Sequence, residues 1–193
     1  MLLFDIGAHF RVFSLAAAAL GGTAVAIDPS PTATHMIARQ AALNGSTDRI
    51  RIVEAAVSDS SGVARMLSSG VFTAGYFRFA NGRLKSDLRP ARAVTVDELA
   101  GEFGAPTHIK IDVEGHEAAA LRGARATLAG GPTLLFLEMH NEMIAAEGGD
   151  PSAALDELAA LDYSTYTFDG RKLERKDILD TPIIRIVARR TGF

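Results

Sequence analysis

The chain has 193 residues, of which 48% are hydrophobic and 22% are charged, a size and composition typical of one globular domain. Its net charge of -3 gives no broad electrostatic reason to bind nucleic acid or an anionic membrane. The absence of cysteine excludes disulfides, thiolate metal sites and a cysteine nucleophile. The longest apolar run, residues 15–27, is interrupted by Gly21 and Gly22 and is too short to span a bilayer, so we expect a soluble, cytoplasmic protein.

Short strands alternate with helices along the chain. The hydrophobic pattern predicts a strand, a helix, a strand, a helix and a strand at residues 2–6, 10–20, 23–27, 32–43 and 50–57. Residues 62–79 are expected as an extra hairpin or flexible segment, and residues 81–90 as a basic loop. After a short helix at 96–103, the pattern predicts a strand, a helix, a strand, a helix and two strands at residues 108–113, 117–129, 134–139, 152–161, 163–168 and 183–188.

This order predicts an α/β fold with a mostly parallel seven-stranded sheet and helices on both faces. Strands separated by helices form right-handed parallel units, whereas the last two strands are joined only by a polar turn at residues 169–176 and should form an antiparallel hairpin. No linker or internal repeat divides the chain. We therefore expect one domain over residues 1–193, with a lid or insert at residues 62–92 as an open alternative to a surface hairpin.

Acidic residues follow three successive predicted strands. Ligands of an open parallel sheet bind beyond the carboxyl ends of its strands, where Asp5 and Gly7 close the first strand. Asp28 lies 23 residues after Asp5, a spacing suited to a ribose diol, and Asp59 could accept the amino group of an adenine. Each residue alone is more often structural, but their order favours a cofactor that carries adenosine.

A second polar group ends the fourth and fifth predicted strands. Lys110, Asp112 and Glu114 share one face if the strand continues that far, and Glu138 and His140 share a face on the neighbouring strand. Asp112, Glu138 and His140 could orient a hydroxyl and remove its proton, or could hold a divalent ion. No histidine-rich metal motif supports the second interpretation. Glu117 and His116 are expected only as helix-start residues.

The segments FDIGAH, AIDPSP, AAVSD, IKIDVEGHE and FLEMH resemble the FkbM-type methyltransferases over about residues 3–170. The resemblance implies a Rossmann-like class I fold and S-adenosylmethionine (SAM) as cofactor, with Asp5 and Gly7 against its methionine end, Asp28 against the ribose and Asp59 near the adenine. The candidate cofactor-binding residues are Asp5, Gly7, Ala8, His9, Asp28, Pro29, Ala56, Asp59 and Asp112.

Two features depart from the family pattern. Where the family loop runs roughly D-x-G-A-N-x-G, His9 replaces the asparagine and Arg11 replaces the second glycine. The chain also begins at its first strand, whereas a preceding segment often covers the cofactor in this family. These departures motivate an alternative, a non-catalytic or weakly active binding protein with the SAM fold. A nicotinamide-dependent dehydrogenase is disfavoured because no full G-x-G-x-x-G occurs.

We therefore predict a SAM-dependent methyltransferase that modifies a hydroxyl of a small molecule, such as a sugar or natural product. Asp112 and Glu138 are predicted to position the acceptor and His140 to act as base. We assign no metal, and leave Asp112 and Glu138 as an unsupported alternative for one. No nucleic-acid or membrane partner is expected, and a homodimer is left open. The aromatic and basic segment at residues 71–90 is either an acceptor lid or a surface hairpin.

Overall fold

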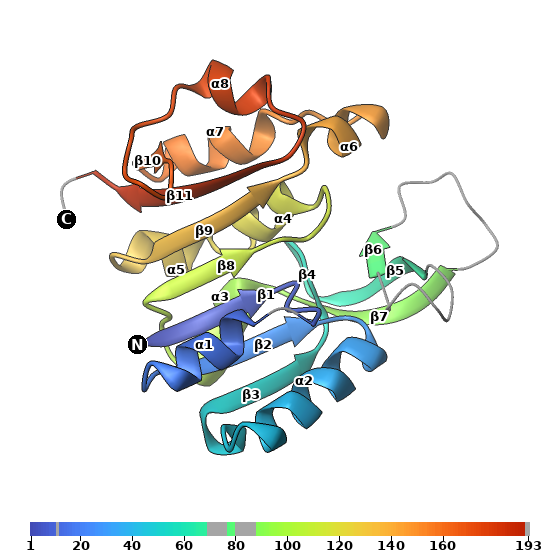
Figure 1. Ribbon diagram of the computed structural model, residues 1–193. Coiled ribbons are helices and arrows are strands. Elements are labelled where there is room, and N and C mark those ends of the chain that lie inside the picture. Colours follow the sequence, from blue (N-terminus) through green and yellow to red (C-terminus); the bar gives the residue numbers. More distant parts are fainter. Residues whose placement is uncertain (11, 69–76, 80–87, 192–193) are drawn as a thin grey trace.

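The computed structural model describes residues 1–10, 12–68, 77–79 and 88–191 and contains the seven-stranded sheet expected from the sequence (Figure 1). Its strands are ordered β10-β11-β9-β8-β1-β2-β3. Six strands run in the same direction, and β11 runs antiparallel to both of its neighbours. Their bounds are β1 (Leu2–Ile6), β2 (Thr23–Asp28), β3 (Ile50–Glu54), β8 (His108–Ile111), β9 (Leu134–Met139), β10 (Tyr163–Tyr166) and β11 (Ile184–Arg190).

Helices cover both faces of this sheet (Figure 1). One face carries α1 (Phe13–Ala19) and α2 (Pro31–Leu43). The opposite face carries α3 (Val96–Phe103), α4 (Glu117–Arg122), α5 (Arg125–Gly130) and α7 (Ala153–Ala160). Three shorter elements lie in the connections: η1 (Thr47–Arg49) before β3, α6 (Asn141–Ala146) after β9 and α8 (Arg175–Leu179) between β10 and β11. Among the described residues, no helix has the length and apolar character needed to cross a membrane.

Alternating side chains in the strands divide the core into two layers. Phe4 and Ile6 of β1 join the larger cluster under α4 and α7, whereas Leu3 faces α1 and α2. Alanines dominate the second layer, where they let the two helices approach the sheet closely; they are Ala17, Ala18, Ala24, Ala26 and Ala41. The same alternation in β8 buries Ile109 and Ile111 in the larger cluster and directs Lys110 to the face that carries α1.

A second sheet of four strands corrects two predictions from the sequence. The expected strand at residues 50–57 is divided, because β3 stays in the main sheet while β4 (Ala56–Val57) pairs in the small one. The expected loop at residues 81–90 ends in β7 (Leu88–Val94), which pairs with β4 and with β5 (Gly62–Ser68). β6 (Phe77–Phe79) completes the sheet, which projects from the main sheet in Figure 1. Residues 69–76 and 80–87, which include most of the predicted lid, lie outside the described residues.

Two helix predictions are also wrong in detail. The expected helix at residues 117–129 is divided into α4 and α5, because the chain changes direction at Gly123 and Ala124. Gly123 rests so closely on the backbone of Ser58 that a Cβ atom at this position would lie 2.1 Å from the Ser58 carbonyl oxygen. The last two strands form the antiparallel hairpin that was expected, but α8 lies between them rather than a polar turn alone.

Candidate functional site

The loop after β1 is packed between the ends of β2 and β8. Gly7 has a φ of 68°, and a Cβ atom there would lie 1.9 Å from the carbonyl oxygen of Asp112, so only glycine fits. The amides of Gly7 and Ala8 both donate to the carbonyl oxygen of Ile27, at 3.0 and 3.1 Å. The loop is therefore fixed in place by the strands on either side of β1.

Lys110 supports this loop from the α1 face. Its buried ammonium group donates to the carbonyl oxygens of Ile6 and Gly7 at 3.1 and 2.6 Å. It also lies 3.4 Å from Oδ1 of Asp5 and 3.8 Å from Oδ2 of Asp112. A single buried cation thus links two carboxylates and two backbone carbonyls, a role that the sequence pattern did not reveal.

Asp5 joins the first strand to the first helix. Its Oδ2 atom accepts hydrogen bonds from the backbone amide and the hydroxyl of Ser14, at 3.1 and 2.7 Å, in the first turn of α1. Because Oδ1 faces Lys110, both oxygens of this fully buried carboxylate have neighbours within the protein. The predicted contact of Asp5 with the methionine end of a cofactor stays a prediction.

Asp28, at the end of β2, is a buried acceptor for two backbone amides. Oδ1 accepts from the amide of Ser30 at 2.8 Å, and Oδ2 accepts from the amide of His9 at 2.9 Å. His9 has a φ of 46°, a left-handed conformation that directs its amide toward this carboxylate. Burial raises the pKa of Asp28, and the two amide bonds oppose the shift. A carboxylate has about four lone-pair positions, so each oxygen can still accept a ribose hydroxyl. Half-buried Pro29 follows directly.

The predicted adenine region lies where the main and small sheets meet. Ala56 is buried in β4, and Asp59 accepts two hydrogen bonds from Arg122 of α4, at 3.2 and 3.1 Å. Burial raises the pKa of Asp59, but the hydrogen bond and charge of Arg122 outweigh it and hold the pKa below its usual value. Next to this pair, Nε2 of His116 lies 3.1 Å from the hydroxyl of Ser58. Burial lowers the pKa of His116 to about 4, so its ring is neutral at neutral pH.

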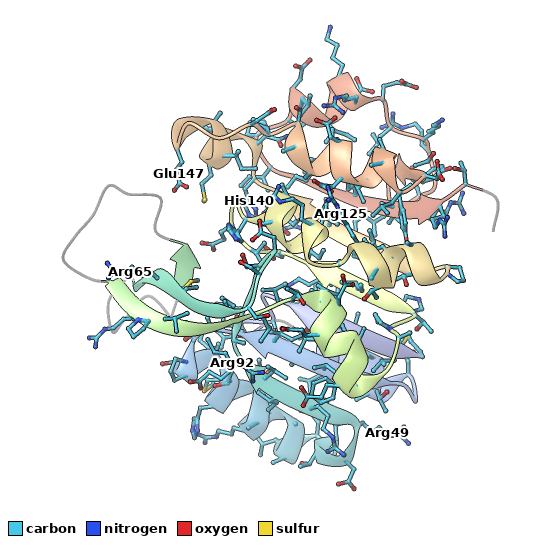
Figure 2. The ribbon with its side chains drawn as sticks, turned by 180° about the vertical axis from the view of Figure 1, so that it is seen from behind. Arg49, Arg65, Arg92, Arg125, His140 and Glu147 are labelled. Carbon is cyan, nitrogen blue, oxygen red and sulfur yellow. The ribbon has the colours of Figure 1, made fainter. Side chains whose placement is uncertain are left out.

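The second group of polar residues comes together at the carboxyl ends of β8 and β9. Nε2 of His140 lies 3.8 Å from Oδ1 of Asp112 and 3.7 Å from Oε1 of Glu138. Its Nδ1 lies 2.8 Å from Oε1 of Glu117. The histidine is buried, and Figure 2 shows it in the middle of the molecule, far from the outer end of the small sheet marked by Arg65.

The surroundings of His140 favour its protonated form. Burial lowers its pKa, but the hydrogen bond and charge of Glu117, together with the charges of Asp112 and Glu138, outweigh burial and hold the pKa above 6.5. Glu138 is itself bound by Arg185 of β11, with Nε 2.6 Å from Oε2. His140 therefore combines one fixed nitrogen with one nitrogen directed at two carboxylates.

Two expectations about neighbouring acids are corrected. Glu114 does not share the face of Lys110, because β8 ends at Ile111 and Glu114 adopts a turn conformation with a φ of 49°. Glu117 is not merely a helix-start residue, since it is fully buried and binds both His140 and the amide of Gly115. The sequence does contain a signal for its burial, because the spacing of Glu117 to Ala120, Leu121 and Ala124 places it on the buried stripe of α4.

A cavity of about 420 Å³ opens beside these two groups, on the face of the sheet that carries α1. Aromatic side chains from α1, from β9 and from the turn after β10 form much of its wall; they are Phe13, Phe136 and Phe168. Its polar groups are Lys110, Glu138 and Arg185. Because Lys110 also binds the Gly7 loop and Glu138 also faces His140, the cavity lies between the predicted cofactor loop and the predicted base.

Comparison with known proteins identifies the family and the fold of the chain. Residues 5–165 match the family model of the methyltransferase FkbM domain. A methyltransferase FkbM structure from Methylobacillus flagellatus superposes with a TM-score of 0.59 at 16% identity, over 97% of this chain and 42% of that one, so the chain spans less than half of that relative. An O-methyltransferase from Bacillus cereus in complex with S-adenosylhomocysteine (SAH) superposes with a TM-score of 0.55 at 13% identity, over 98% of this chain and 74% of that one.

A third similar structure contains the methyl donor SAM. Magnesium protoporphyrin IX methyltransferase from Synechocystis, with bound SAM, superposes with a TM-score of 0.53 at 11% identity, over 99% of this chain and 70% of that one. At these identities the structural likeness shows the fold alone. No curated protein matches the sequence.

Proposed function

The chain belongs to the FkbM methyltransferase family, and from that premise we propose that it transfers a methyl group from SAM to a hydroxyl of a small molecule. The observation that carries the proposal is the position of His140 Nε2, which faces two carboxylates beside the cavity and near the cofactor loop. SAM as cofactor is supported by the neighbours described as holding SAH or SAM.

SAM is proposed to lie across the carboxyl ends of β1, β2 and β4. The glycine at position 7 lets a ligand approach the backbone, and Asp28 can receive the ribose hydroxyls through its remaining lone pairs. Asp59 and its partner Arg122 would then border the adenine. Ala8, His9, Pro29 and Ala56 complete this set along the same edge, with Asp112 at its border with the acceptor.

The acceptor is proposed to enter the cavity on the α1 face with its hydroxyl toward His140. Aromatic walls favour a ring or the apolar face of a sugar. The hydroxyl oxygen would attack the methyl carbon as the carbon–sulfur bond breaks, giving the methyl ether and SAH, while the hydroxyl proton passes to Nε2 of His140. Asp112 and Glu138 would orient the hydroxyl and stabilise the resulting imidazolium.

The test has two stages. Calorimetric titration with SAM should show one binding site per chain, and SAH release should be measured with a panel of phenols and glycosides. In the variant His140→Ala we expect turnover to fall about a hundredfold or more, because a positioned general base contributes at least that much, while the affinity for SAM changes little. His35→Ala, on the exposed side of α2, is the matched control.

Three outcomes decide the proposal. No heat of binding at millimolar SAM would refute it. Binding without SAH release from any acceptor would support a non-catalytic binding protein instead. Unchanged turnover in His140→Ala, with a normal control, would remove this histidine from the reaction.

A further inference from the structure

Three side chains of the types that bind divalent cations converge near the cavity. One ligand atom from each of Asp112, Glu138 and His140 lies within 4.8 Å of the other two. The distances from Nε2 of His140 to the nearer carboxylate oxygens are 3.8 and 3.7 Å. Two atoms that are each bound at about 2.1 Å to one cation are about 3 to 4.2 Å apart, so both of these distances suit ligands of a shared ion.

Each of these side chains is held from behind by another residue. Glu117 accepts a hydrogen bond from Nδ1 of His140 at 2.8 Å. Arg185 binds Oε2 of Glu138 at 2.6 Å, and Lys110 lies 3.8 Å from Oδ2 of Asp112. In His140 and Asp112 the atom that is held is different from the atom that faces the other ligands, whereas Arg185 also donates a longer hydrogen bond, of 3.3 Å, to Oε1 of Glu138. Such outer contacts orient metal ligands and fix the histidine tautomer.

The tautomer of His140 determines which of its two ring nitrogens can bind an ion. Because a carboxylate accepts only, Nδ1 carries the hydrogen that it donates to Glu117. Nε2, in a side chain that is 7% exposed, is then the ring nitrogen that faces the two carboxylate oxygens. A cation at this position would be bound by Nε2 and by both oxygens together.

We propose that a divalent transition-metal ion binds between Asp112, Glu138 and His140. Two carboxylates and one imidazole form a mixed oxygen and nitrogen set that suits ions such as Mn²⁺ better than Mg²⁺, which prefers oxygen alone. Binding of the ion does not depend on methyl transfer. Only its role rests on the proposed function: with the ion bound, His140 would serve as a ligand in place of a base, the ion would lower the pKa of an acceptor hydroxyl that it binds, and the proton would leave to water.

The experiment uses Mn²⁺ and the whole chain after removal of metals with a chelator. Calorimetry and electron paramagnetic resonance near neutral pH should show one bound Mn²⁺ per chain, with nitrogen coupling from the imidazole in the spin-echo signal. Asp112→Asn and His140→Ala should each weaken binding at least tenfold, and His140→Ala should abolish the nitrogen coupling. Glu117→Gln should weaken binding about tenfold through the lost orienting charge.

Asp156→Asn, which alters an exposed ion pair with Arg175, is the control and should bind as the unchanged protein does. Circular dichroism shows which variants remain folded, and the folded ones decide the result. Absence of binding at millimolar Mn²⁺, or equal affinity in all folded variants, would overturn the proposal. Titration of the unchanged protein with SAM distinguishes the metal site from the proposed function. If the protein binds Mn²⁺ but not SAM, only the proposed function is contradicted.

Discussion

At the scale of single residues, Lys110 is a buried cation whose partners come from two parts of the chain, residues 5–7 and Asp112. Its positive charge lies close to the carboxylates of Asp5 and Asp112, and its ammonium group donates hydrogen bonds to the carbonyl oxygens of Ile6 and Gly7. Replacement of Lys110 by methionine keeps most of the side-chain volume. It leaves the buried carboxylates of Asp5 and Asp112 without the ammonium group that neutralises them. A buried pair that loses one partner costs about 3–5 kcal/mol.

We therefore expect Lys110→Met to lower the free energy of unfolding by about that amount in urea titrations, and to weaken SAM binding because the Gly7 loop loses its support. Lys172→Met, at an exposed position, should change the free energy of unfolding by less than about 0.5 kcal/mol. Equal stability of the two variants would show that Lys110 does not hold the site together.

His116 gives a residue-scale prediction about pH. Its pKa of about 4 in the folded chain lies below the ordinary 6.5, because burial disfavours the charged ring despite the nearby charges of Asp59 and Glu117; Arg122 adds to the lowering. Below pH 6.5 the unfolded chain therefore binds a proton that the folded chain does not. The stability contribution is complete above pH 6.5 and is lost as pH falls toward 4.

In His116→Gln this part of the pH dependence should disappear. The difference in free energy of unfolding between the two proteins should change by at most about 3 kcal/mol between neutral pH and pH 4, as measured by urea denaturation at several pH values. If the free energy of unfolding changed with pH in the same way in both proteins, the His116 ring would have to be protonated in the folded chain over this pH range.

At the scale of elements, the junction between α4 and α5 depends on Gly123. Its φ of -72° is an ordinary helical value, so backbone preference alone would favour alanine by about 1 kcal/mol. The contact with Ser58 predicts the opposite sign, because the added Cβ atom would lie 2.1 Å from a backbone oxygen and the helix would have to move. Overpacking of this kind costs about 1–3 kcal/mol.

Gly123→Ala should thus lower the melting temperature, and also move α4 and with it Asp59's partner Arg122. Gly101→Ala in α3 is a matched control, since nothing lies within 4 Å of the Cβ atom that it adds. It should raise stability by about 0.5–1 kcal/mol. Stabilisation by both substitutions would contradict the close contact between Gly123 and Ser58.

At the scale of the whole molecule, local pattern predicted the strands of the main sheet but missed β7 and did not show that β4 joins a second sheet. The seven strands of the main sheet and the final hairpin follow from hydrophobic runs and connection lengths. The division of residues 50–57 between two sheets does not, because pairing of β4 with β7 depends on residues about 37 positions away. The break between α4 and α5 at Gly123 could not be predicted from the local pattern either, because its cause is a contact with the backbone of Ser58 in a distant loop.

The same distinction applies to the site. Parity along β8 and β9 correctly grouped Asp112, Glu138 and His140, because the ends of adjacent parallel strands meet at one edge. The supporting contacts of Glu117 and Lys110 depend on side-chain burial that a single sequence does not specify. Arg11, the residue that departs most from the family loop, lies outside the described residues.

The central position of β1 also governs when the cofactor loop can form. β1 pairs with β2, which follows soon in the chain, but also with β8, and Lys110 reaches the carbonyls of Ile6 and Gly7 across 104 and 103 positions. Until the chain has been synthesised through β8, the first loop has neither the Asp112 backbone beneath it nor the ammonium group beside it. Long loops close late in folding because their entropic cost precedes the contacts that repay it. A ligand of this loop therefore recognises only the nearly complete fold, so it should slow unfolding and leave the early steps of folding unchanged.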